Sequence, residues 1–145
     1  MVVEQMHRLR LGQIGLQGTP FREGTAAVIL DENDTIILVV SRSAGFGRDG
    51  DAPTTLWTVV AVSGDIDHDT VPLLREALTQ ALDDRNPVLC DLTRVTYFGA
   101  AAAGLTLNMH VRAVASGQRF ALHGASVMIE RVLAVVDPHR ILVRA

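Results

Sequence analysis

From residue 35 to residue 143, strand-length apolar runs alternate with stretches whose apolar residues recur at helical spacing. The first two runs, 35–40 and 56–62, have no helical pattern between them and predict an antiparallel pair joined by a long loop over 41–55. Each later strand is separated from the next by a helix, which implies right-handed crossovers and parallel pairing. The predicted fold class is α/β, a mixed, mostly parallel sheet with helices packed against it, in the order β-β-α-β-α-β-α-β. The later elements are expected as helices over 70–83, 101–115 and 126–136 and as strands over 88–92, 118–122 and 141–143.

The first 33 residues lack this periodicity. They contain several glycines and one proline, and only Val28–Leu30 has the character of a short edge strand. We therefore divide the chain into an N-terminal extension over 1–33, whose degree of order the sequence leaves open, and one α/β domain over 34–145. A chain of 145 residues is long enough for one domain to bury its own core without disulfides or metals.

The charge and hydropathy of the chain exclude several classes of function. The formal net charge is −3 and the arginines are interspersed with acidic residues, so no basic face for nucleic acid is predicted. No apolar run approaches the roughly 18 residues of a membrane span, and the N-terminus lacks the architecture of a signal peptide. These features predict a cytoplasmic protein that binds neither nucleic acid nor membrane.

The residues that usually carry enzymatic or metal chemistry form no recognisable constellation. The five histidines share no helical face, and Cys90, the single cysteine, lies in an apolar run and is expected to be buried. No serine, threonine or cysteine stands in a nucleophile motif beside a base. The chain is therefore predicted to be no enzyme and to hold no metal and no cofactor.

One glycine-rich stretch, Gly45-Phe46-Gly47-Arg48-Asp49-Gly50, matches the G-x-G-x-x-G pattern of dinucleotide-binding sites. In such sites the glycines open a helix whose N-terminus binds the phosphates. Here the next predicted element is the strand over 56–62, so no helix would face a bound phosphate. We interpret the stretch as a hairpin loop and not as a nucleotide site.

A turn with three acidic residues follows the strand over 56–62. Asp65, Asp67 and Asp69 precede the next helix, where Asp69 or Thr70 is expected to provide the cap and carboxylates interact favourably with the helix dipole. The spacing lacks the downstream glutamate of a calcium-binding loop, so no metal site is predicted. Two roles stay open for these carboxylates, helix capping and recognition of a partner.

Two segments carry a resemblance to a known family. The first is Val62-Ser63-Gly64-Asp65-Ile66-Asp67, which leads into a helix containing Pro72-Leu73. The second is VLCDLTRVTYFGAAAA over 88–103. Together they resemble the STAS domain, shared by anti-sigma-factor antagonists and the cytoplasmic tails of sulfate transporters, with its patterns G-[DE]-[IL]-D and D-L-S-x-V-x-x-[IF]-D-[ST]-[SA]-G-L. The resemblance covers roughly residues 35–143.

The resemblance implies a regulatory protein-binding domain of bacterial transcription control. In switching members of the family, a kinase-like anti-sigma factor phosphorylates the first hydroxyl residue of the D-[ST]-[SA]-G segment, and the added charge of roughly −1.5 to −2 spoils the docking surface. In this chain Gly99 stands in place of the aspartate, Ala100 in place of the phosphoacceptor and Ala102 in place of the glycine. The resemblance thus implies an anti-sigma-factor antagonist that has lost its serine switch.

The resemblance places the partner-binding residues in two segments. One is the acidic turn, and the other is the corner over 96–103, where a strand leads into the next helix. Small side chains at the corner would let the backbone of an anti-sigma factor approach closely. Several alternatives stay open: Thr96 or Thr93 as a replacement phosphosite, a drifted surface, a module that senses a small apolar or nucleotide ligand, and a self-associating scaffold such as a homodimer. The residues concerned are Asp65, Asp67, Asp69, Thr96, Gly99, Ala100, Ala101 and Ala102.

Overall fold

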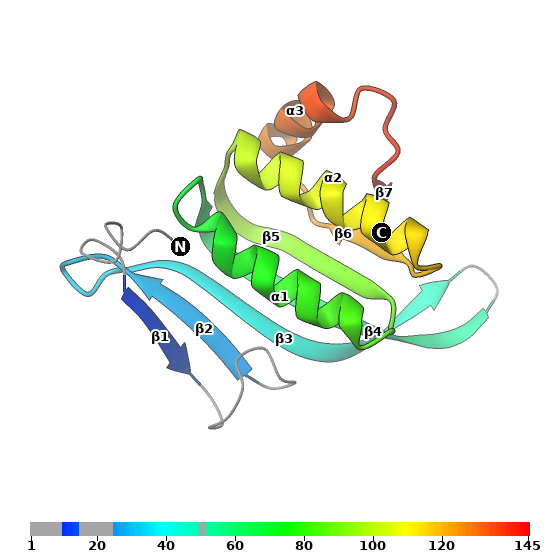
Figure 1. The fold of residues 1–145 in the computed structure, drawn as a ribbon, viewed down its shortest axis with the longest axis horizontal. Helices are drawn as coiled ribbons and strands as arrows, with labels where there is room; N and C mark the ends of the chain where they lie inside the picture. The colour runs from blue at the N-terminus through cyan, green and yellow to red at the C-terminus, as the bar shows by residue number, and fades with distance from the viewer. Residues whose placement is uncertain (1–9, 15–24, 50–51) are drawn as a thin grey trace.

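The computed structural model describes residues 10–14, 25–49 and 52–145 (Figure 1). This part of the chain forms one seven-stranded sheet and three helices. None of these helices is long and apolar enough to cross a membrane. The strands are β1 (Arg10–Ile14), β2 (Thr25–Leu30), β3 (Ile36–Asp49), β4 (Ala52–Ile66), β5 (Val88–Phe98), β6 (Phe120–His123) and β7 (Val143–Arg144). The helices are α1 (Val71–Asp83), α2 (Ala100–Ala115) and α3 (Val127–Val136).

The seven strands lie in the sheet in the order in which they occur in the chain. β1 to β4 pair antiparallel, and β4 to β7 pair parallel through the crossover helices. From β3 onward the order of elements is β-β-α-β-α-β-α-β, which confirms the predicted fold class. The antiparallel part is larger than predicted because β1 and β2 add two strands in front of β3.

The predicted N-terminal extension contributes strands to the same sheet. β2 is longer than the edge strand expected at Val28–Leu30, and it is not at the edge, because β1 pairs with its outer side. Ala27 and Ile29 of β2 are 2% and 1% exposed and belong to the hydrophobic core. Residues 1–9 and 15–24 of the extension lie outside the described ranges, and the division of the chain at residue 33 stays a prediction.

β3 and β4 form one long hairpin that extends beyond the helices (Figure 1). The loop predicted over 41–55 is therefore wrong, since β3 continues to Asp49 and β4 begins at Ala52. Ladder hydrogen bonds come from the backbone, so a glycine-rich segment can extend a strand when a partner strand lies beside it; Gly45 pairs opposite Trp57. Within the described residues the G-x-G-x-x-G stretch lies in β3 and opens no helix.

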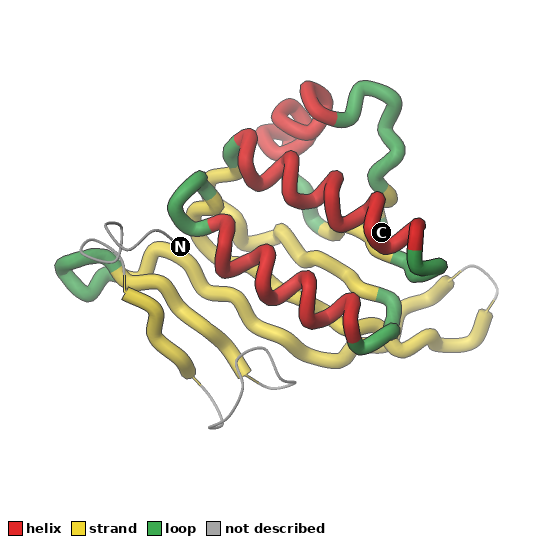
Figure 2. Tube along the Cα trace, viewed as in Figure 1, coloured by secondary structure: helices red, strands yellow, loops and turns green. Residues whose placement is uncertain are grey.

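The three helices pack on one face of the sheet (Figure 2). Strand residues that point to this face and the inner sides of all three helices form a single buried cluster. Fully burying one such aliphatic side chain stabilises the fold by roughly 1.5–3 kcal/mol. Members of the cluster that are 1% exposed or less include Leu38, Val60, Leu74, Leu78, Cys90, Leu105, Leu122 and Ile129.

Charged groups hold the segment that follows α3. Glu130 on α3 accepts two hydrogen bonds from the guanidinium of Arg144, of 3.0 Å from Nε and 2.8 Å from Nη2. The buried carboxylate of Asp137 accepts from the N–H groups of Ile141 and Leu142 at 2.8 and 2.9 Å. Because these two N–H groups are occupied, β7 begins at residue 143 and not at residue 141 as predicted.

Candidate functional site

The acidic turn between β4 and α1 is closed by hydrogen bonds among its own residues. Oδ1 of Asp67 accepts from the N–H groups of Asp69 at 2.9 Å and Thr70 at 3.0 Å. The Thr70 hydroxyl donates to the carbonyl oxygen of Asp65 at 2.8 Å and accepts from the N–H of Asp67 at 3.0 Å. Thr70 occupies the N-cap position of α1, one of the two predicted, but its hydroxyl makes no capping bond to the helix. The carboxylate of Asp67 therefore fixes the shape of the turn.

The turn is joined to the neighbouring strand by one hydrogen bond between side chains. Asp65 pairs with Tyr97 across the parallel strands β4 and β5, and the hydroxyl of the exposed Thr96 donates to Oδ1 of Asp65 at 2.5 Å. The carboxyl ends of neighbouring parallel strands lie at the same edge of a sheet, so the two predicted segments come together there. Thr93, the other alternative phosphosite, donates its hydroxyl to Asp91 Oδ1 at 2.5 Å, away from this pair.

The strand-to-helix corner lies directly beside the turn. The N–H of Gly99 donates to the carbonyl of Ile66 at 3.0 Å, and the carbonyl of Gly99 accepts from Ala103 at 3.1 Å in the first turn of α2. A Cβ on Gly99 would lie 3.3 Å from Cε1 of Tyr97, so the exposed tyrosine ring would have to move by a few tenths of an ångström to accept a side chain here. Ala100 is exposed and Ala101 half-buried, whereas Ala102 is fully buried in the core and its side chain does not reach the surface.

An open hollow of about 570 Å³ lies next to the corner, between the end of β5 and α3. Its walls are mostly apolar and carry side chains with large exposed areas: Tyr97 is 51%, Met128 37% and Val135 81% exposed. Arg131 on α3 adds a positive charge to the wall. The contribution of α3 to this surface was not predicted from the sequence. Its apolar spacing predicted a helix but did not reveal which of its sides stays uncovered.

The corner and the hollow offer a surface of defined shape. Cys90 lies away from it, in the core, and burial raises the pKa of its thiol to about 12, so the thiol is protonated at neutral pH. The part of the chain that the structure describes contains no group of three or more acidic, histidine or cysteine side chains placed to hold a metal ion. At the corner, the described residues present small side chains, one exposed aromatic ring and an apolar wall.

The family is identified by comparison with family models. The model described as "Mlab, STAS domain" matches residues 55–144, which is more than half of the chain. The chain belongs to this STAS family, and the match confirms the resemblance drawn from the two sequence motifs. A comparison with curated proteins gave no match.

Two solved structures share the fold. A crystal structure of an anti-sigma factor antagonist from Mycobacterium paratuberculosis is 23% identical, with a TM-score of 0.52 over 72% of this chain and 87% of that chain. The anti-sigma factor antagonist SpoIIAA in its unphosphorylated form is 16% identical, with a TM-score of 0.52 over 71% of this chain and 88% of that chain. The chain therefore has the fold found in anti-sigma factor antagonists.

Proposed function

We propose that this chain is a cytoplasmic regulatory protein that binds a kinase-like anti-sigma factor and thereby releases the sigma factor. We also propose that this binding is not controlled by phosphorylation of a serine. The observation that carries it is the corner at Gly99 and Ala100, where a half-buried glycine and an exposed alanine adjoin the apolar hollow. The likeness of the fold to two anti-sigma factor antagonists supports the assignment of the partner.

The surface around the corner has the composition of a protein-docking site. Exposed tyrosine and aliphatic side chains are costly to leave in water, and covering them contributes about 25 cal/mol for each Å² of apolar surface. Tyrosine and arginine are also the residues in which binding energy concentrates at interfaces, and here Tyr97 and Arg131 line the same hollow. Ala100 lies at the rim, where a larger side chain would hold a partner's backbone away.

The three aspartates of the turn have different roles in the proposed complex. Asp67 is engaged in the turn through its Oδ1, so we assign it a positioning role. Asp65 and Thr96 form one hydrogen-bonded pair beside the corner and would meet the partner together. Asp69 is half-buried in the same turn and contributes negative charge to this edge of the sheet.

The proposal can be tested with purified candidate anti-sigma factors encoded in the same genome, measured one at a time by biolayer interferometry. The variants are Ala100→Glu, which mimics a phosphate charge, and Ala100→Gln, which adds similar volume without charge. An acidic residue in the first turn of α2 interacts favourably with the helix dipole, so Ala100→Glu should fold. Ala115→Glu, at the exposed far end of the same helix, is the matched control.

We expect one candidate to bind the wild type and the Ala115→Glu control equally. Ala100→Glu should raise the dissociation constant at least about tenfold, since an unmatched charge in an interface costs more than 1.4 kcal/mol. Ala100→Gln should have a smaller effect. If no kinase-like anti-sigma factor binds the wild type, the assignment of the partner is wrong. If binding occurs but Ala100→Glu leaves it unchanged, the corner is not the docking site.

A further inference from the structure

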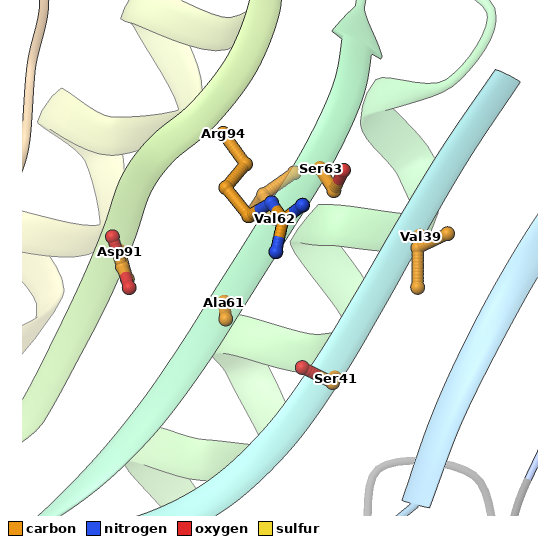
Figure 3. Close-up of a pocket in the computed structure, with 7 residues that line it drawn as sticks. All are labelled: Val39, Ser41, Ala61, Val62, Ser63, Asp91 and Arg94. Carbon is orange, nitrogen blue, oxygen red and sulfur yellow. The ribbon is translucent and has the colours of Figure 1, made fainter.

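The second face of the sheet, opposite the helices, carries a separate set of side chains. Two rows run across three strands in register: Val39, Ser63 and Arg94 form one, and Ser41, Ala61 and Asp91 form the other. These six residues line a shallow hollow of about 370 Å³ (Figure 3). None of the six belongs to the buried cluster under the helices. Along a strand, successive side chains alternate between the two faces, so this surface is distinct from the core face.

An irregularity in β5 places a base and an acid on this same face. Ala61 pairs with Asp91 and Ser63 with Arg94, so a step of two residues on β4 corresponds to a step of three on β5. The extra residue is a β-bulge, and it reverses the alternation of side chains along β5. Without it, Asp91 and Arg94 would point to opposite faces of the sheet. With it, both border the hollow (Figure 3).

The two charges do not neutralise each other within the chain. Arg94 is exposed and makes no hydrogen bond or ion pair with any residue that the structure describes. Asp91 accepts two hydrogen bonds from Thr93, and both go to Oδ1. Beside the charges, on β3 and β4, lie small or apolar side chains, of which Val39 and Ala61 are half-buried. The face thus presents an acid and a base, displaced along β5, next to small and apolar side chains on β3 and β4.

We propose that this face binds a second copy of the same chain, sheet against sheet, about a two-fold axis. In such an isologous contact residue i of one copy meets residue j of the other and the reverse also holds. Asp91 of each copy then meets Arg94 of its partner, and the two acid–base pairs lie along β5, beside the small and apolar side chains of β3 and β4. Sheets pack face to face at about 10 Å, a spacing at which half-buried valine and alanine side chains interdigitate.

The charge pattern is the argument for a second copy over an unrelated partner. A surface that carries both signs in a displaced pair is complementary to itself, whereas a partner of one sign would meet one like charge. The proposed dimer also leaves the corner accessible, because the hollow beside Ala100 and the hollow beside Arg94 share no lining residue. The dimer would therefore display two docking corners.

Sedimentation equilibrium of the full chain tests the proposal, over concentrations up to about 1 mM, where even weak homodimers form. Two single variants, Arg94→Asp and Asp91→Arg, each give a face of one sign, and each should be monomeric or bind itself at least about tenfold more weakly. Mixed one to one, the two variants should form a heterodimer, because each charge then meets its opposite. Arg75→Asp, on the exposed side of α1, changes the charge equally and should dimerise like the wild type.

Asp91→Arg also removes the hydrogen bonds to Thr93, so its folding is checked by circular dichroism. Should it fail to fold, Asp91→Asn, which keeps an oxygen to accept those bonds and removes the negative charge, must dimerise more weakly than the wild type. A wild type that stays monomeric up to about 1 mM overturns the proposal. So does an Arg94→Asp or Asp91→Asn variant that dimerises as tightly as the wild type, or a mixture of two folded single variants that shows no heterodimer.

Discussion

The hydroxyl of Thr96 on β5 donates a hydrogen bond of 2.5 Å to Oδ1 of Asp65 on β4. The two residues lie 31 positions apart in the sequence, and their bond joins the acidic turn to the strand that leads into the corner. The main-chain bond from Gly99 to Ile66 runs between the same two segments. The turn and the corner are therefore one structural unit, and a change in either should be felt in both.

A double-mutant cycle on Asp65 and Thr96 measures this coupling. We expect Asp65→Ala and Thr96→Val each to lower the free energy of unfolding by about 1 kcal/mol, as for a hydrogen bond that is partly accessible to water. The double variant should lose less than the sum, with a coupling energy of roughly 0.5–1.5 kcal/mol in urea denaturation. Thr35→Val, at an exposed turn, is the control and should stay within about 0.5 kcal/mol of the wild type. Additive losses would contradict the bond.

Gly64 should tolerate no side chain. Its φ of +110° lies in the region that only glycine adopts readily, and a Cβ there would lie 2.1 Å from the carbonyl oxygen of Ile37 on β3. We expect Gly64→Ala to lower the free energy of unfolding by about 3 kcal/mol or more. Gly117, with a φ of +70° and no atom within 4 Å of its Cβ position, is the matched control. Gly117→Ala should cost about 1 kcal/mol. Equal losses would show that the contact with Ile37 does not matter.

The ion pairs after α3 should make the fold sensitive to acid. The hydrogen bond from Arg144 holds the pKa of Glu130 below its ordinary value of 4.5. Burial acts to raise the pKa of Asp137, but the N–H groups of Leu142 and Ile141 outweigh it and hold this pKa below 3.8. Groups with a depressed pKa stabilise the fold above their unfolded-state pKa, and this contribution is lost as the pH falls through the folded-state value.

The acid sensitivity is measured as the urea midpoint at pH steps from neutral to below the ordinary carboxyl values. The midpoint should be constant near neutral pH and fall once the pH drops below about 4.5, as Glu130 and Asp137 take up protons. Arg144→Met keeps the aliphatic stem and removes the charge, so part of this slope should disappear. Arg75→Met, on the exposed side of α1, should keep the full slope. A slope that is identical in all three proteins would contradict the assignment.

The parallel half of the fold could be predicted from the sequence because its signals are local. Each strand is a continuous apolar run and each helix has apolar residues at helical spacing. The extension of β3 could not be predicted, since Gly45 gives no periodicity and its strand conformation depends on the backbone of Trp57 across the hairpin. The same holds for β2, whose Ala27 and Ile29 become core residues only because β3 lies beside them.

The candidate site could be predicted in part. The motifs identified both the turn and the corner, and the parallel pairing of β4 and β5 explains why they meet. The wall formed by Met128 and Val135 could not be foreseen, because their exposure depends on how α3 packs. The bulge that places Arg94 on the same face of the sheet as Asp91 also left no signal in the sequence pattern.

The methyl group of Ala100, exposed at the first position of α2, has a consequence for how the chain can be controlled. A methyl group cannot be phosphorylated, so the surface at this position keeps the same shape and charge under all conditions in the cell. If a partner docks here, its occupancy follows mass action, and it rises and falls smoothly with the abundance of the two proteins. As far as this position is concerned, synthesis and degradation would then set the response, and the chain would act as a titrant.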